Sequence, residues 1–178
     1  DVMDMLSPLA AQKHINMAFY YAENIPQHVV GDALRFKQIL TNLISNAIKF
    51  TPDGEIIVRV RMEDDEIGQC LLHFSVQDSG IGLSGTDRKK LFESFSQGDA
   101  SVTRQFGGTG LGLAISKQLV HLMHGQIGFE DNQERAPTEK GSTFWFTASF
   151  KVDEQDEFVE HPHFDHLKVV SYLAHPAT

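Results

Sequence analysis

The chain is poor in cysteine, tryptophan and proline, and it has no long hydrophobic run. Its single cysteine, Cys70, excludes an intrachain disulfide framework and a thiolate metal site. No apolar stretch is long enough to cross a bilayer, and the N-terminus lacks the pattern of a signal peptide. Lys and Arg (15) are outnumbered by Asp and Glu (24), which gives a net charge of −9. Neither nucleic acid nor an anionic membrane surface is therefore expected as a main partner.

The remaining composition is that of a folded domain. Hydrophobic residues make up 41% and aromatic residues 10% of the 178 residues, enough for one domain with a core. We expect residues 1–152 to form it. Residues 153–160 are acidic, 161–166 are histidine-rich (HPHFDH) and 167–173 resemble a strand, so 153–178 is predicted to be a linker and the start of a following domain. The histidines flank Pro162, which favours a solvated linker over a metal site. We expect the chain to be part of a longer protein.

Apolar periodicity predicts helices and strands in alternation, an α/β class. Helices are expected at 1–13, 32–50, 86–95 and 111–124, and strands at 15–22, 55–62, 69–77, 126–131 and 142–152. An acidic loop, 63–68, should join two of these strands into an antiparallel hairpin. Residues 97–108 are polar and glycine-rich, which is typical of a mobile lid.

Polar residues repeat on one face of the predicted helix that begins after Asp32. Gln38, Asn42, Asn46 and Lys49 follow one another at spacings of four, four and three. A carboxamide oxygen is a ligand that Mg²⁺ accepts beside phosphate oxygens, and a lysine can offset phosphate charge. An ordinary solvated helix face is an equally good interpretation of this pattern alone.

The segment DSGIG (78–82) follows directly after an apolar strand. The Asp78 carboxylate can accept a hydrogen bond from the amino group of adenine, whereas it would repel the keto oxygen of guanine. Gly80 and Gly82 allow a base to approach the backbone closely. With Gly85 they also spell the dinucleotide fingerprint G-x-G-x-x-G, but polar residues 86–90 follow where that motif needs an apolar helix. A plain Asp-Ser-Gly turn is the other alternative.

A glycine run, GGTGLG (107–112), precedes the predicted helix 113–124. Free amides at a helix N-terminus bind anions without a lysine, which matters in so acidic a chain. The run lacks the Gly-Lys-Ser/Thr ending of a P-loop, and a merely flexible loop is the alternative.

In this order, LTNLISNAIKF, DSGIG, LFESFSQGD and GGTGLGLAIS closely resemble the ATP-binding catalytic domain of sensor histidine kinases, over about Asp32 to Phe150. The sequence segment FGGTGLGLAISKQLV and the C-terminal strand are most similar to those of hybrid sensor kinases of the BarA/GacS type. The resemblance implies the GHKL (Bergerat) fold, a two-layer α/β sandwich with a mixed, largely antiparallel sheet and helices on one face. It also implies that the domain beginning within 153–178 is receiver-like.

The same resemblance implies ATP and Mg²⁺ as cofactors. Asn46 would bind Mg²⁺, Asn42 and Lys49 would contact the phosphates, and these three would be the catalytic residues. Thr143, in a final glycine motif, would help to hold the base. Arg104 is predicted to reach the γ-phosphate, with a mobile surface arginine as the alternative. The full predicted nucleotide site comprises Asn42, Asn46, Lys49, Phe50, Asp78, Gly80, Gly82, Arg104, Gly108, Thr109, Gly110, Leu111, Gly112 and Thr143.

The resemblance also distinguishes a kinase from a hydrolase. Gyrase, Hsp90 and mismatch-repair ATPases carry a water-activating glutamate at the place of Asn42, and an amide cannot act as that general base. We therefore expect phosphoryl transfer to a histidine on a separate dimerisation domain. None of the nine histidines has the expected acceptor context; His14, for instance, is followed by Ile15 and Asn16.

The implied partners are the dimerisation/histidine phosphotransfer domain of the same kinase and a receiver domain or response regulator, with no nucleic acid and no membrane contact by this segment. The implied location is the cytoplasmic domain of a bacterial sensor kinase anchored in the inner membrane. An ATP hydrolase of the same superfamily and a non-catalytic nucleotide-binding docking module stay open as alternatives.

Overall fold

The computed structural model of the chain describes residues 2–22, 24–66, 68–82, 91–92, 111–132, 141–152 and 168–172. Its elements are α1 (Val2–Ala11), β1 (Ile15–Tyr21), β2 (Val29–Val30), α2 (Ala33–Phe50), β3 (Gly54–Glu66), β4 (Gln69–Asp78), α4 (Gly112–Leu122), β5 (Ile127–Asp131), β6 (Ser142–Val152) and β7 (Lys168–Tyr172).

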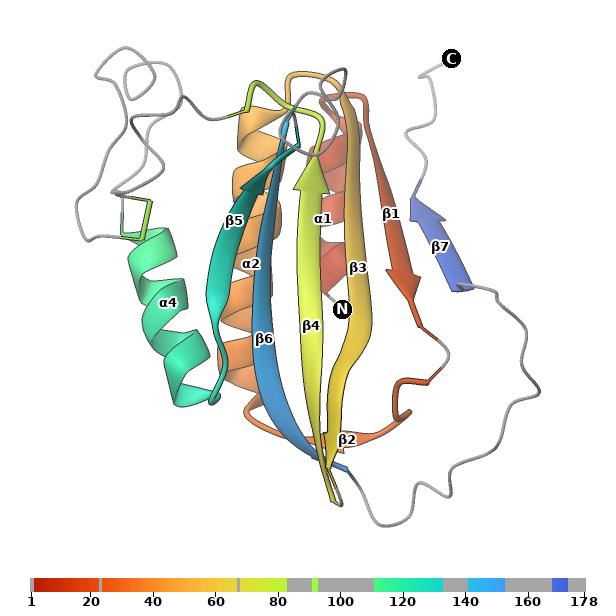
Figure 1. Cartoon of the computed structure of the whole chain (residues 1–178). Helices are drawn as coiled ribbons and strands as arrows, with labels where there is room; N and C mark the ends of the chain where they lie inside the picture. The colour runs from red at the N-terminus through yellow and green to blue at the C-terminus, as the bar shows by residue number, and fades with distance from the viewer. Residues whose placement is uncertain are drawn as a thin grey trace.

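The strands form one mixed sheet in the order β2-β6-β4-β3-β1-β7, with β5 paired to β6. Only β1 and β3 run parallel among these pairs. Figure 1 shows α1 and α2 behind one face of the curved sheet, with α4 beside β5 at the left. The predicted fold class, a two-layer α/β sandwich with helices on one face of a mixed sheet, is confirmed.

The core lies between α2 and the central strands. Ile39, Ile44 and Ile48 on the apolar stripe of α2 are almost fully buried. On β4 every second residue from Cys70 to Asp78 is buried, so the period of the strand carries the Asp78 carboxylate onto the core-facing side. The row of buried apolar residues on β4 therefore ends in a buried carboxylate, that of Asp78.

Both ends of α2 are stabilised by side chains. Asp32 is the N-cap and accepts a hydrogen bond of 3.0 Å from the backbone N–H of Arg35, as predicted. At the other end, the Lys13 ammonium donates to the carbonyl oxygens of Ile48 (2.8 Å) and Lys49 (3.1 Å). A cation there satisfies free carbonyls and complements the helix dipole. The final turn of α2, which carries Lys49, is therefore fixed in place.

The hairpin between β3 and β4 is longer than predicted. The prediction of a loop at 63–68 is wrong, because β3 runs to Glu66 and pairs it with Gln69 after a register shift between Met62 and Asp64. This part of the ladder projects past the core, where exposed acidic side chains leave the backbone pairing intact. The short strand β2, which pairs with the end of β6, was not predicted either.

Helix α4 also ends differently in detail. Gly125 directly after the predicted helix 111–124 favours a glycine C-cap, but the left-handed residue is His124, with φ 55°. Gly125 is needed for another reason: a Cβ there would overlap the carbonyl oxygen of Thr147 on β6. Close approach of two backbones, rather than a positive φ, selects glycine at this position.

The C-terminal strand β7 pairs antiparallel with β1, from Met17 with Tyr172 to Tyr21 with Lys168. That it begins a following domain stays a prediction. The predicted helix 86–95, apart from its residues 91–92, the lid 97–108 and the histidine cluster 161–166 lie outside the described residues. Among the helices that are described, none is both long and apolar enough to cross a membrane.

Thr51, just after α2, is completely buried, and its hydroxyl is the one buried side-chain polar atom in the described part of the chain without a hydrogen-bond partner. Thr51→Val keeps the shape and removes this desolvated hydroxyl, so we expect the free energy of unfolding to rise by about 1 kcal/mol. Urea denaturation measures the change.

The matched control is Thr147→Val, because the buried Thr147 hydroxyl accepts a 2.9 Å hydrogen bond from the N–H of Gln126. This variant should lose about 1–3 kcal/mol, since it leaves that N–H without its partner. Equal destabilisation of both variants would show that the Thr51 hydroxyl has a hydrogen-bonding role.

Candidate nucleotide-binding site

The polar face of α2 meets the beginning of α4. The Asn42 carboxamide donates a 2.9 Å hydrogen bond to the hydroxyl of Ser116, which is buried on α4. A Cβ on Gly112 would overlap the Asn42 side-chain oxygen, so the first turn of α4 packs directly against this amide. A pocket of about 470 Å³ lies along this junction and is lined in part by Asn42, Ser45, Gly112 and Ser116.

Among the described residues at the N-terminus of α4, none is acidic. Leu111 occupies the N-cap position without a side-chain hydrogen bond, and no acidic residue lies in the first turn. The amides of this turn therefore lack the side-chain cap that most helices have, and the positive end of the helix dipole adds to their attraction for an anion. The predicted contributions of Arg104, Gly108, Thr109 and Gly110 lie outside the residues that the structure describes.

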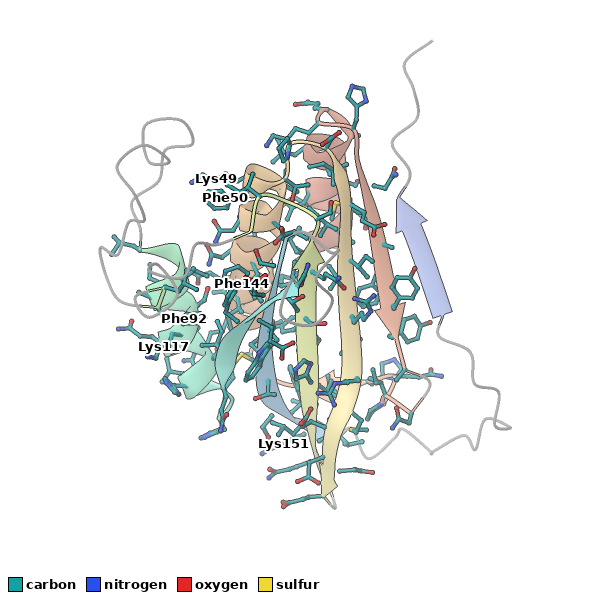
Figure 2. All side chains as sticks on the ribbon, turned by 45° about the horizontal axis from the view of Figure 1, so that its top comes forward. Lys49, Phe50, Phe92, Lys117, Phe144 and Lys151 are labelled. Atoms are coloured by element: carbon teal, nitrogen blue, oxygen red, sulfur yellow. The ribbon has the colours of Figure 1, made fainter. Side chains whose placement is uncertain are left out.

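The last turn of α2 holds the predicted metal and phosphate ligands. Asn46 and Lys49 are half-buried, and the Lys49 ammonium lies 4.9 Å from the ring centroid of Phe50. Figure 2 shows Lys49 and Phe50 together at the end of α2 that lies beside the loop after β4. The Asn46 carboxamide makes no hydrogen bond to the described residues, so its oxygen is available as a ligand. The donor set fits a Mg²⁺–phosphate group, with one neutral oxygen, one cation and uncapped amides.

Asp78 is the centre of the other end of the site. Its carboxylate accepts a 2.9 Å hydrogen bond from the Gly80 N–H and two more from the N–H and hydroxyl of Ser142. The Phe50 carbonyl oxygen accepts from the Ile81 N–H at 3.3 Å and would overlap any Cβ on Gly80. The DSGIG segment is thus fastened to the end of α2, and Gly82 continues it with φ 72°.

Burial raises the pKa of Asp78 above its ordinary value of 3.8, and the hydrogen bonds from Gly80 and Ser142 offset part of this effect. A native pKa above the unfolded value means that the folded state holds the proton more tightly. The contribution of Asp78 to stability should therefore grow as the pH falls through the native pKa and level off below 3.8.

Urea denaturation of the wild type and of Asp78→Asn across this pH range tests the sign. The wild-type free energy of unfolding minus that of the variant should increase on acidification. A difference that decreases as the pH falls would show that the carboxylate is stabilised, not destabilised, by its surroundings.

Ser142, rather than Thr143, supplies the hydroxyl beside the Asp78 carboxylate. The Thr143 hydroxyl bonds to the side-chain oxygen of Asn132 at 2.8 Å, and it is Ser142 that contacts the carboxylate. The two-residue period of β6 indicates Ser142. Phe146, Ala148 and Phe150 are buried on the side that faces the helices, and Ser142 lies on the same side of the strand. Asn132 follows the predicted strand 126–131, and its position carries no such signal.

The structure therefore assembles the predicted residues in two groups. Asn42 and Gly112 meet where α2 crosses α4, next to Leu111. Asp78, Gly80 and Phe50 meet at the other end, with Gly82 close to Gly141. Lys49 and Asn46 lie on α2 between them. In the part of the chain that the structure describes, Asn132 links Thr143 to Asp78. The role of Thr143 in holding the base stays a prediction, as do the roles of the other site residues.

The chain is similar to known proteins over most of its length. Residues 31–152 match the family described as histidine kinase-, DNA gyrase B-, and HSP90-like ATPase. The sensor histidine kinase GacS of Pseudomonas protegens is 45% identical over 156 residues, which are 88% of this chain and 16% of that protein. The signal transduction histidine-protein kinase BarA of Escherichia coli K12 is 39% identical over 146 residues, which are 82% of this chain and 15% of that protein.

The fold is also similar to solved structures of histidine kinases. Full-length ShkA in complex with AMPPNP has a TM-score of 0.67 and 33% identity, and the match covers 85% of this chain and 29% of that one. The nucleotide-free catalytic domain of the histidine kinase ThkA has a TM-score of 0.62 and 25% identity, and the match covers 83% of this chain and 88% of that one.

The chain belongs to the family of histidine kinase-, DNA gyrase B- and HSP90-like ATPases, a class defined by its ATP-binding fold. Within that class it is a catalytic domain of the histidine kinase kind, as the relatives named above show. It spans about a sixth of the length of GacS.

Proposed function

We propose that this chain binds ATP with Mg²⁺ and transfers the γ-phosphoryl group to a histidine on a separate dimerisation domain of the same sensor kinase. The observation that carries the proposal is the Asn42 amide at the junction of α2 and α4. This residue stands where the hydrolysing members of the superfamily have a glutamate, and an amide cannot take a proton from water.

Each end of the site would bind a different part of the nucleotide. The Asp78 carboxylate would accept a hydrogen bond from the adenine amino group, and the glycines beside it give the base room. The uncapped amides of α4 would bind phosphate oxygens, and Lys49 would balance their charge. Asn46 would hold Mg²⁺, which neutralises phosphate charge when bound.

The protein would promote the transfer mainly by positioning the reacting groups. A ring nitrogen of the acceptor imidazole forms a bond to the γ-phosphorus as the bond to the bridging oxygen breaks, and ADP leaves. The site residues would hold the γ-phosphoryl group in line for this attack and exclude water as a competing nucleophile. The chain contains no histidine in the expected acceptor context, so the imidazole must come from another domain.

The partners follow from the much longer relatives. We expect a dimerisation/histidine phosphotransfer domain before this segment and a receiver domain or response regulator as the next phosphate acceptor, as in hybrid kinases. We also expect the whole protein to be anchored in the inner membrane, with this domain in the cytoplasm. These expectations rest on the similarity to GacS and BarA.

Calorimetric titration and a phosphate-release assay on the chain alone test the proposal. We expect 1:1 binding of ATP with Mg²⁺ and phosphate release at the background rate. Phosphate release that depends on Asn42 would identify a hydrolase instead. Failure to bind ATP would contradict the proposal altogether.

A further inference from the structure

One buried side chain outside the predicted site joins three strand ends. Asn132 directly follows β5 and is only 3% exposed. Its side-chain nitrogen donates to the backbone carbonyl of Asp78 at the end of β4, at 3.0 Å. Its side-chain oxygen accepts from the hydroxyl of Thr143 on β6, at 2.8 Å.

The chemistry of the partners fixes the orientation of this amide. A backbone carbonyl can only accept, so the group that faces Asp78 must be the NH₂ of Asn132. The oxygen then faces Thr143, whose hydroxyl must donate. Neither an aspartate nor a hydrocarbon at position 132 can make both bonds.

These two bonds connect the backbone segments that flank the Asp78 carboxylate. Thr143 is adjacent to Ser142, whose N–H and hydroxyl both donate to the Asp78 carboxylate. Gly141, just before Ser142, has φ 96° and packs so closely on the Asp78 carbonyl that a Cβ would overlap it. Asn132 thus spans the same two segments whose separation sets the hydrogen bonds between Ser142 and Asp78.

We infer that Asn132 is a positioning residue of the nucleotide site: by joining the Asp78 carbonyl to the Thr143 hydroxyl, it keeps Ser142 against the Asp78 carboxylate and so aims that carboxylate at the amino group of the base. The inference rests on the proposed function, because it concerns how adenine is recognised. Asn132 itself touches no nucleotide in this scheme. Its loss should therefore affect recognition of the amino group more than recognition of the phosphates.

Two nucleotides separate this role from a general loss of stability. ATP and purine riboside triphosphate differ in the 6-amino group, so the ratio of their dissociation constants reports recognition of that group. For the wild type, in competition with a fluorescent ATP analogue, we expect ATP to bind roughly tenfold or more tightly than purine riboside triphosphate, the value of a charge-assisted hydrogen bond. In Asn132→Ala this ratio should fall towards one, mainly through weaker ATP binding.

Further variants keep the test decisive if Asn132→Ala does not fold. Asn132→Asp has the same size but places an oxygen against the Asp78 carbonyl, and Thr143→Val removes the donor to Asn132; both should reduce the ratio as well. Thr147→Val is the matched control, because it removes another buried hydroxyl bond from the same strand away from Asp78. It should lower thermal stability and leave the ratio unchanged.

The possible results distinguish a failure of the Asn132 role from a failure of the proposed function. A wild-type chain that does not bind ATP would contradict the proposed function. A wild type that prefers ATP, with folded Asn132 and Thr143 variants that keep the same ratio, would overturn only the role of Asn132. A loss of ratio in Thr147→Val equal to that in Asn132→Ala would also overturn it, because any weakening of β6 would then suffice.

Discussion

Replacement of Asn46 by alanine should reduce phosphoryl transfer to an added acceptor domain by at least about 100-fold, the scale seen when one electrostatic contact to a transition state is removed. The carboxamide is half-buried on the last turn of α2 and makes no hydrogen bond to the described residues. Folding should therefore be little affected, because no hydrogen bond of the amide to the described residues is lost. Circular dichroism and transfer of radiolabelled phosphate measure the two effects.

Gln69→Ala is the matched control for Asn46→Ala. It removes an exposed carboxamide from the start of β4, at the opposite end of that strand from Asp78. Transfer by this control should equal that of the wild type. Asn46→Asp should also fail in transfer, because it adds a negative charge beside the phosphates. Wild-type transfer by folded Asn46→Ala with Mg²⁺ would show that the metal is held elsewhere.

Asp78→Asn should weaken ATP binding by about 1.5–3 kcal/mol, roughly 10- to 150-fold, as expected for loss of a charge-assisted hydrogen bond. The carboxylate accepts from Gly80 and twice from Ser142. An asparagine presents an NH₂ group to one of these donors or to the adenine amine, and two donors cannot pair. Calorimetric titration with ATP measures the loss.

Asp65→Asn makes the same chemical change on an exposed residue near the tip of the β3–β4 hairpin, far along β4 from Asp78. Its ATP affinity should stay at the wild-type value. Near-wild-type affinity in Asp78→Asn would rule out the proposed contact between this carboxylate and the base, whatever the effect of the control.

Much of the fold could be predicted because local rules and tertiary structure agree. The Asp32 cap, the apolar stripe of α2 and the strand that ends at Asp78 each follow from short-range spacing. The same spacing places Asn42, Asn46 and Lys49 on one face, and the structure puts that face beside α4. The class of fold and the proposed phosphate end of the site thus follow from patterns within single elements.

The features that the sequence did not reveal depend on contacts between distant segments. Acidic residues 63–66 favour a loop by composition, yet they continue β3 because β4 supplies the pairing. The choice between Ser142 and Thr143 depends on which face of β6 meets Asp78, which the glycine motif alone does not specify. Asn132 acquires its importance only from Asp78, 54 residues earlier in the chain. No local pattern can encode such a contact.

The identity of the phosphate acceptor tests the central claim most directly. The chain is mixed with a separate acceptor-helix domain, Mg²⁺ and γ-labelled ATP, and the labelled product is treated with acid and with base. We predict label on the added domain only, as acid-labile and base-stable phosphohistidine, at a modest rate because the covalent tether is absent. Release of labelled inorganic phosphate by the chain alone, abolished by Asn42→Ala, with no label on the acceptor domain, would contradict the account and identify a hydrolase.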